Sequence, residues 1–323
     1  MEKILAFIDL LGFSQMVNED EAKARIVLND FYNIAFTSIK SKPDIRGHLF
    51  SDSLLAYSDS KESLINCLAE IYQHCLLKNA SYDQLSKFFL LPRGALSVGI
   101  VNIEDRETAP NLTKGFIVSQ ALVHSARLES QIKGSRLLVA VKNGRQEQMQ
   151  LDWNANIRYG LYEDDNFTFL PNYKYKDVLW FSSFHEGRRQ KERLITLIDI
   201  AIRLVKENAR NERVLLQHIW TLRIGLLSYS KYLGQEDDFV INRIIKEFKA
   251  DQYWLIWMTL IEMIVTDSHE WKYAVSKKIV AFYKRTSLKK GWANLIDELN
   301  KPGEQYALKC FERFLDEMLI RTN

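Results

Sequence analysis

Two aspartates near the start of the chain could bind divalent metal ions if the fold brings them together. Asp9 follows a short apolar run with the composition of a buried strand, and it precedes a glycine turn. Asp52 lies in a predicted turn between two strand-like segments, 46–50 and 54–57. Paired carboxylates can hold two Mg²⁺ or Mn²⁺ ions roughly 4 Å apart, the arrangement that serves phosphoryl and nucleotidyl transfer. Either residue alone would more often cap a turn, so the prediction depends on the pair.

The order of the predicted elements places both aspartates at one edge of a sheet. The pattern predicts a strand, a helix over 22–39, the hairpin, a helix from Ser60, a strand over 95–103, a helix over 118–131 and a strand over 135–142. This order is typical of an α+β, ferredoxin-like (split βαβ) unit with an antiparallel sheet and helices on one face. In that fold the end of the first strand lies beside the hairpin, so we expect Asp9 and Asp52 to be close. The backbone of Leu10, Gly12 and Phe13, at a turn entering a helix, could then cradle a triphosphate.

The composition is that of an ordinary globular protein. Of the 323 residues, 47% are hydrophobic and 26% are charged, and the formal charge of +3 neither favours nor excludes a nucleic-acid partner. The cysteines Cys67, Cys75 and Cys310 are few and unpatterned, which indicates buried thiols in a reducing compartment. The N-terminus lacks the basic region and cleavage site of a signal peptide, and the most apolar later stretch, 254–265, is too short to span a membrane. We expect a soluble, cytoplasmic protein with neither a membrane nor a nucleic acid as its partner.

The character of the chain changes near residue 183. Beyond it, apolar residues recur at the spacing of helix faces, glycine becomes scarce, and five of the seven tryptophans occur. We therefore predict a first domain over 1–183 that carries the site, followed by an all-α C-terminal domain over 184–323. The second domain contains no motif that indicates a role. Its basic clusters, 188–191 and 284–290, are typical of solvated helix ends.

Short motifs over residues 4–140 resemble, in order and spacing, those of the class III nucleotidyl cyclases. They are Asp9-Leu10-Leu11-Gly12-Phe13-Ser14, Phe50-Ser51-Asp52-Ser53, Arg93-Gly94-Ala95-Leu96-Ser97-Val98-Gly99, Ala126-Arg127-Leu128-Glu129-Ser130, and Gly134-Ser135 followed by 137–139. The fourth motif matches only approximately, because the spacer before its arginine is missing. Each motif alone would be weak, and together they predict a cyclase-like domain.

The resemblance implies roles for individual residues. Asp9 and Asp52 would hold two Mg²⁺ or Mn²⁺ ions, and the ribose 3′-oxygen of a nucleoside triphosphate would attack the α-phosphate with loss of pyrophosphate. Arg127, supplied by the partner in a head-to-tail homodimer, would neutralise charge in the transition state. Arg93 would contact phosphate or the dimer partner.

Departures from the family pattern concern the base and the ribose. His48 occupies the place where purine cyclases have a base-reading Lys or Glu, Val123 stands where they have a ribose-orienting Asn, and the upstream base-reading position falls near Phe116. Arg46 shares a strand face with His48, and both are candidate base contacts, with solvation and a structural role as the alternatives. These changes argue against an ordinary adenylate or guanylate cyclase. The motifs are more similar to those of the pyrimidine cyclases of bacterial antiphage signalling (Pycsar), which make cyclic UMP or cyclic CMP, and we expect UTP to be preferred over CTP.

Three other functions remain open at this point. The lost base and ribose contacts also fit a degenerate, non-catalytic cyclase homologue that binds a nucleotide or a partner. A purine cyclase is a second alternative. A dinucleotide cyclase or a polymerase relative would need a signature such as Gly-Gly-Asp-Glu-Phe in the hairpin, which Phe-Ser-Asp-Ser lacks.

Overall fold

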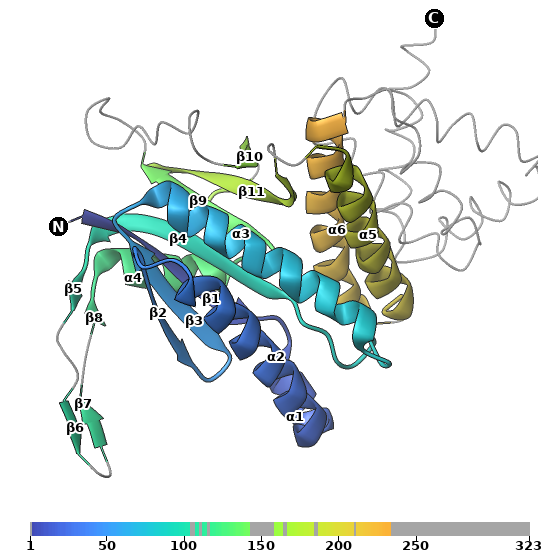
Figure 1. Cartoon of the computed structure of the whole chain (residues 1–323), viewed down its shortest axis with the longest axis horizontal. Helices are drawn as coiled ribbons and strands as arrows, with labels where there is room; N and C mark the ends of the chain where they lie inside the picture. The colour runs from blue at the N-terminus through green and yellow to red at the C-terminus, as the bar shows by residue number, and fades with distance from the viewer. Residues whose placement is uncertain are drawn as a thin grey trace, which may run out of the picture. The chain divides into compact units, whose positions relative to one another are not determined.

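The computed structural model describes residues 2–103, 107–109, 112–114, 117–142, 158–163, 167–183, 187–209 and 211–233 (Figure 1). The helices are α1 (Phe13–Glu19), α2 (Glu21–Lys40), α3 (Lys61–Lys78), the 3₁₀ turn η1 (Asn79–Ser81), α4 (Gln120–Glu129), α5 (Gly187–Glu207) and α6 (Glu212–Leu233). The strands are β1 (Glu2–Leu10), β2 (Ile45–Phe50), β3 (Ser53–Ser58), β4 (Pro92–Ile100), β5 (Asn102–Ile103), β6 (Glu107–Ala109), β7 (Leu112–Lys114), β8 (Ile117–Val118), β9 (Leu137–Lys142), β10 (Tyr159–Glu163) and β11 (Tyr173–Ser183).

A seven-stranded sheet in the order β10-β11-β9-β4-β1-β3-β2 forms the centre of the fold. The four strands β4, β1, β3 and β2 are neighbours in this order and pair antiparallel, as predicted for a split βαβ unit. The expectation of a fully antiparallel sheet was wrong at one pair, because β4 and β9 run parallel. Parallel neighbours need a long crossover connection, and α4 lies in the connection between β4 and β9.

The expectation of helices on only one face of the sheet was also wrong. Alternate residues of β1 point to opposite faces. Leu5 packs with Ala121 of α4, whereas Gly47, which shares the face of Ala6, lies against Ile39 of α2. The sheet is therefore covered by α2 and α3 on one face, seen in front in Figure 1, and by α4 on the other. The physical reason lies in β1, whose residues 4–6 are buried on both faces and need a cover on each side.

Helix α5 and residues 216–229 of α6 belong to the same compact unit as the sheet, which comprises residues 1–208 and 216–229. Helix α5 packs against α3 and β11. In α6, Gln217 Oε1 accepts a hydrogen bond of 2.5 Å from the amide of Gly134, and Thr221 Oγ1 accepts one of 2.9 Å from the amide of Ser135. Most of the predicted helical domain over 184–323, together with Cys310, lies outside the described residues, so the domain division stays a prediction.

A buried ion pair ties three elements of this unit together. The Arg136 guanidinium donates from Nε to Asp177 Oδ1 at 2.8 Å and from Nη2 to Oδ2 at 2.7 Å. Both side chains are at most 2% exposed, and Arg223 Nη1 of α6 lies 3.8 Å from the same carboxylate. Trp220 of α6 lies under both guanidinium groups at 4.9 Å. The negative charge of Asp177 in β11 thus offsets positive charge from Arg136, which precedes β9, and from Arg223 of α6.

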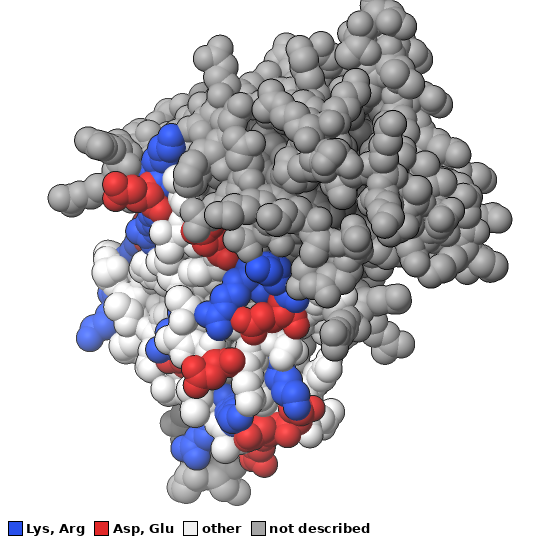
Figure 2. Space-filling model, turned by 90° about the vertical axis from the view of Figure 1, so that its right-hand side faces the viewer, with Lys and Arg blue, Asp and Glu red and all other residues white. Residues whose placement is uncertain are grey.

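Cys67 and Cys75 are buried free thiols, as predicted, and burial raises the pKa of Cys67 to about 11. No helix among the described residues is both long and apolar enough to cross a membrane. On the face shown in Figure 2, the described Lys and Arg side chains are interspersed with Asp and Glu side chains.

His218 of α6 makes the stability of this unit depend on pH. It is fully buried against the ring of Phe89, with centroids 4.8 Å apart, and burial lowers its pKa from 6.5 to about 3. Between these two values the unfolded chain binds the proton and the folded chain does not, so stability is complete above about pH 6.5 and falls on acidification. We expect the loss toward pH 4 to be on the order of a few kcal/mol, and His218→Leu to flatten it. Urea unfolding of both proteins at several pH values measures the slope; an equally steep fall in the variant would contradict the assignment.

Candidate active site

The structure brings Asp9 and Asp52 together at the end of β1. Asp9 pairs in register with Ser53, the first residue of β3, and Asp52 directly precedes it in the turn of the β2–β3 hairpin. The amide of Leu10 donates to the carbonyl of Asp52 at 3.2 Å, which fixes the turn against the strand end. The hydroxyl of Ser53 donates to Asp9 Oδ1 at 3.0 Å and orients that carboxylate. The neighbourhood expected from the fold is present, and the metal-binding role of the pair stays a prediction.

Electrostatics at this edge favour a bound cation. The pKa of Asp9 is raised, first by burial and then by the negative charge of Asp52, while the Ser53 hydrogen bond and the charge of Arg93 act in the opposite direction. A divalent ion between the carboxylates would remove both the repulsion and the cost of burial. Oxygen donors of this kind suit Mg²⁺ and Mn²⁺.

The pair by itself would leave an ion with open coordination positions. No group of three or more His, Cys, Asp or Glu side chains with metal-binding geometry occurs among the described residues. Mg²⁺ is commonly held by one or two carboxylates and completes its shell with waters and substrate phosphates. The donor set therefore fits a metal that is shared with a phosphorylated substrate.

The glycine turn after β1 offers fewer amides than the sequence suggested. Gly12 has a φ of 71° and stands at the start of α1, as a left-handed turn before a helix requires. The amide of Leu10 is engaged by Asp52, and the amide of Leu11 donates to the carbonyl of Leu91 at 2.9 Å. Leu10 is therefore not available as an amide donor to a phosphate. Gly12 and Phe13 remain the candidates from this stretch.

A strip of the sheet on the face of Asp9 continues along β2, which has exposed residues, whereas the residues of β3 are buried. Phe50 pairs with Ser53, so Phe50, His48 and Arg46 share the face of Asp9. Phe50 is 47% exposed and lies 6.2 Å from the ring of Phe7, while Arg46 is exposed. The exposed part of this strip thus combines an aromatic ring with a cationic side chain.

His48 has a structural contact within this strip. Its ring stacks on Tyr57 with centroids 6.1 Å apart and an angle of 21° between the planes, and Tyr57 is buried. Contact of His48 or Arg46 with a base stays a prediction. Phe116, the other position at which the sequence departs from the purine cyclases, lies outside the described side chains.

Arg93 lies directly opposite Asp9 on β4 and is held by the end of α4. Its Nε donates to Glu129 Oε1, and its Nη1 donates to the carbonyl of Ile132 at 3.2 Å. Glu129 has a side chain only 8% exposed, and its pKa is raised by burial, against the opposing charge of Arg93. Contact of Arg93 with phosphate stays a prediction. Two of its nitrogens, Nε and Nη1, already donate to Glu129 and Ile132.

Glu129 was not among the site residues predicted from the sequence, although a signal was present. Ala121, Ser125 and Leu128 form the buried stripe of α4, and Glu129 falls on the same stripe. An acidic residue on a buried helix face needs a cationic partner, because an unpaired buried carboxylate is costly. That requirement points to Arg93 only once the pairing of β1 with β4 and the position of α4 against these strands are known.

Arg127 lies on the opposite side of α4. Residues two positions apart on a helix point to opposite sides, and Arg127 is exposed where Glu129 is buried. It is not among the groups that shift the pKa of Asp9. The structure thus does not join Arg127 to the aspartates of its own subunit, and its predicted role requires a second subunit.

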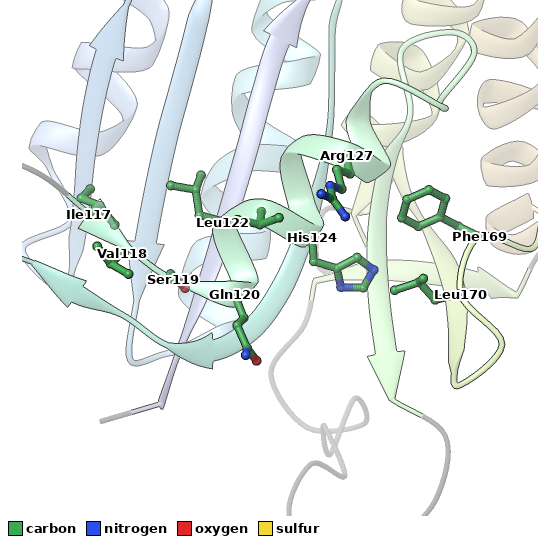
Figure 3. Close-up of a pocket in the computed structure, with 10 residues that line it drawn as sticks. Ile117, Val118, Ser119, Gln120, Leu122, His124, Arg127, Phe169 and Leu170 are labelled. Carbon is green, nitrogen blue, oxygen red and sulfur yellow. The ribbon is translucent and has the colours of Figure 1, made fainter.

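A pocket of about 470 Å³ lies beside Arg127 (Figure 3). Its lining comes from β8, the exposed side of α4 and the loop that holds Phe169 and Leu170. His124 forms part of it: its Nδ1 lies 3.1 Å from Ser97 Oγ and its Nε2 lies 3.4 Å from the hydroxyl of Tyr175. Burial lowers the pKa of His124, so this ring is neutral at pH 7. The pocket presents Arg127 at the rim of a largely apolar surface.

Solved structures of nucleotide cyclases are similar to part of the chain. The guanylyl cyclase Cya2 is 15% identical, with 59% of this chain and 96% of that chain covered and a TM-score of 0.43. The adenylyl cyclase CyaB from P. aeruginosa is 16% identical, with 58% and 96% covered and a TM-score of 0.42. A bacterial light-regulated adenylyl cyclase is 14% identical, with 61% of this chain and 57% of that chain covered and a TM-score of 0.42. Neither a protein-family model nor a curated protein matches the chain.

Proposed function

We propose that this chain is a nucleotidyl cyclase of the class III type. Its reaction converts a pyrimidine nucleoside triphosphate, UTP in preference to CTP, to the 3′,5′-cyclic nucleotide and pyrophosphate. The product serves as a second messenger in bacterial antiphage defence. The observation that carries the proposal is the Asp9–Asp52 pair at the strand end, where burial and repulsion raise the pKa of Asp9 and favour a cation.

The residues divide the chemistry between them. Asp9, oriented by Ser53, and Asp52 would hold two Mg²⁺ or Mn²⁺ ions, which would make the ribose 3′-hydroxyl more acidic and would neutralise charge on the triphosphate. The amides of Gly12 and Phe13 lie at the adjacent turn and bind a phosphate oxygen. The 3′-oxygen loses its proton to solvent and forms a bond to the α-phosphorus, while the bond to the oxygen bridging the α- and β-phosphates breaks. Arg127 neutralises the charge that develops on the oxygens around the α-phosphorus.

The partner that completes the site is a second copy of the chain. Arg127 has exposed apolar neighbours around the pocket, with Val118 58%, Val123 52% and Leu170 39% exposed. Exposed apolar surface of this kind, together with a catalytic group that its own subunit does not use, is expected at an interface. In a head-to-tail dimer with two-fold symmetry, each α4 faces the aspartates of the other subunit, so two composite sites form.

Selectivity for a pyrimidine base rests on the departures at His48 and Val123. His48 stacks on Tyr57 where purine cyclases have a Lys or Glu that reads the base, and the apolar, exposed Val123 stands where they have an Asn that orients the ribose. A purine cyclase and a non-catalytic homologue are the alternatives. The intact carboxylate pair favours an active enzyme over a degenerate one.

Incubation with each of the four nucleoside triphosphates and Mn²⁺ tests the proposal. We expect cyclic UMP as the main product, with a smaller amount of cyclic CMP, identified by mass spectrometry against standards. Cyclic AMP or cyclic GMP as the main product would keep the cyclase and refute the pyrimidine selectivity. No cyclic nucleotide from any of the four would refute the cyclase, and a dinucleotide product would indicate a different two-metal enzyme.

A further inference from the structure

The ion pair between Arg93 and Glu129 joins the two catalytic elements of one subunit. Arg93 is the β4 residue that pairs with Asp9 of β1. Glu129 is the last residue of α4, the helix that carries Arg127 two positions earlier. The pair therefore connects the strand end that holds the metal-binding carboxylates to the helix that presents the arginine.

This connection is built from several contacts. Besides the bond from Nε to Glu129, Arg93 Nη1 donates to the carbonyl of Ile132 at 3.2 Å. The neighbours of Arg93 are tied to the same segment: the amide of Gly94 donates to the carbonyl of Arg136 at 3.0 Å, and the hydroxyl of Ser135 donates to the carbonyl of Pro92 at 2.5 Å. The segment that follows α4, up to Arg136, is thus hydrogen-bonded to the start of β4 at several points, and Arg93 makes the ionic contact among them.

Burial makes the pair sensitive to the loss of either partner. The side chain of Glu129 is 8% exposed and that of Arg93 is 22% exposed. A buried ion pair that loses one member leaves the other uncompensated, and the neighbouring backbone shifts to hydrate it. Here such a shift would move the end of α4 relative to β1, and a displacement of about 1 Å at a catalytic group costs on the order of 100-fold in rate.

We propose that Arg93 and Glu129 are positioning residues that hold the Asp9–Asp52 half-site and the Arg127 half-site of each subunit in one fixed relation. This inference rests on the proposed cyclase and its head-to-tail dimer. In that dimer the two half-sites of one subunit serve two different composite sites. The ion pair then links the two sites, and a defect in one subunit reaches both of them.

A heterodimer with one complete site tests the inference. One subunit carries Arg127→Ala and the other carries Asp9→Asn with Asp52→Asn, so the only complete site takes its aspartates from the first and its arginine from the second. Glu129→Gln, which keeps the size and removes the charge, is then placed in either subunit. We expect each placement to lower kcat by at least about tenfold while the KM for the nucleotide changes by less than about threefold. Glu163→Gln, which breaks a surface pair with Lys174, is the matched control and leaves both values unchanged.

Two outcomes of this assay would overturn the inference. A loss confined to one placement would mean that Glu129 supports a single half-site, and unchanged turnover in both would mean that the pair only packs. Arg93→Lys, which keeps the charge and removes the fork of hydrogen bonds, replaces Glu129→Gln if that variant does not fold, with the same pattern expected.

Binding of Mn²⁺, followed by electron paramagnetic resonance, separates this inference from the proposed function. We expect Glu129→Gln to raise the Kd of the homodimer for Mn²⁺ by at least about threefold, since Asp9 moves with β4. If the wild-type protein binds Mn²⁺ but forms no cyclic nucleotide, the proposed function fails, and the Mn²⁺ affinity of the variant still decides the positioning role. An unchanged Kd would overturn it.

Discussion

Asp9→Asn is expected to lower cyclic-nucleotide formation by at least roughly 10³-fold without destabilising the fold. The rate falls because an amide is a poor ligand for Mg²⁺ or Mn²⁺ and leaves charge on the triphosphate without compensation. Burial and the charge of Asp52 raise the pKa of Asp9, so the folded protein destabilises the ionised form of this carboxylate. Its replacement by a neutral amide therefore retains the fold or makes it more stable. Steady-state turnover and thermal unfolding, measured on the same preparation, separate the two effects.

Two variants serve as controls for this prediction. Asp59→Asn removes an exposed carboxylate that pairs with Lys3 at the far end of β1, and it should leave turnover unchanged. Ser53→Ala removes the 3.0 Å hydrogen bond to Asp9 and keeps the carboxylate, so a smaller loss of about tenfold is expected. If Asp9→Asn retained more than about a tenth of the wild-type turnover, the metal-binding role of this residue would be refuted.

Asp177→Asn should destabilise the protein more than any surface charge change. The carboxylate is fully buried and accepts two hydrogen bonds from Arg136, which is itself 2% exposed, and Arg223 lies 3.8 Å away. Without that charge, Arg136 loses both of its ion-pair hydrogen bonds to Asp177 and Arg223 loses a nearby counter-charge, and breaking a buried ion pair costs about 3–5 kcal/mol. Urea unfolding at neutral pH measures the change in the free energy of unfolding.

The matched comparison for Asp177 is Glu163, a partly exposed carboxylate of β10 that pairs with Lys174 and Lys176. Glu163→Gln is expected to cost at most about 1 kcal/mol, because water screens exposed ion pairs. Equal losses in the two variants would show that burial of the Arg136–Asp177 pair does not set its contribution to stability.

The local pattern of the chain was enough to predict the order of the main strands and helices and the place of the aspartates, although the short strands β6, β7 and β8 were not predicted. Asp9 at a strand end and Asp52 in a hairpin turn are properties of a few adjacent residues, and the split βαβ order then places both at one edge. Helix starts were predictable for the same reason: Ser60 caps α3 by accepting a hydrogen bond from the amide of Ser63. Such features depend on residues close in sequence, which is why they can be read from it.

The tertiary structure decided which groups are free to act. The amide of Leu10 is engaged by Asp52, so a donor that the sequence offered to a phosphate is already used. Glu129 became a candidate only through Arg93, a residue distant in sequence that the sheet brings against the end of α4. Helix α4 covers the sheet face of Asp9 with its buried stripe, which includes Glu129, so Arg127 lies on the exposed side of the helix and points away from the aspartates of its own subunit. Hydrogen-bond partners and burial depend on contacts between distant segments, and periodicity along the chain does not specify them. By itself the sequence determined that a carboxylate pair exists at the end of β1, whereas the tertiary structure decided how that pair is charged, oriented and connected to the rest of the site.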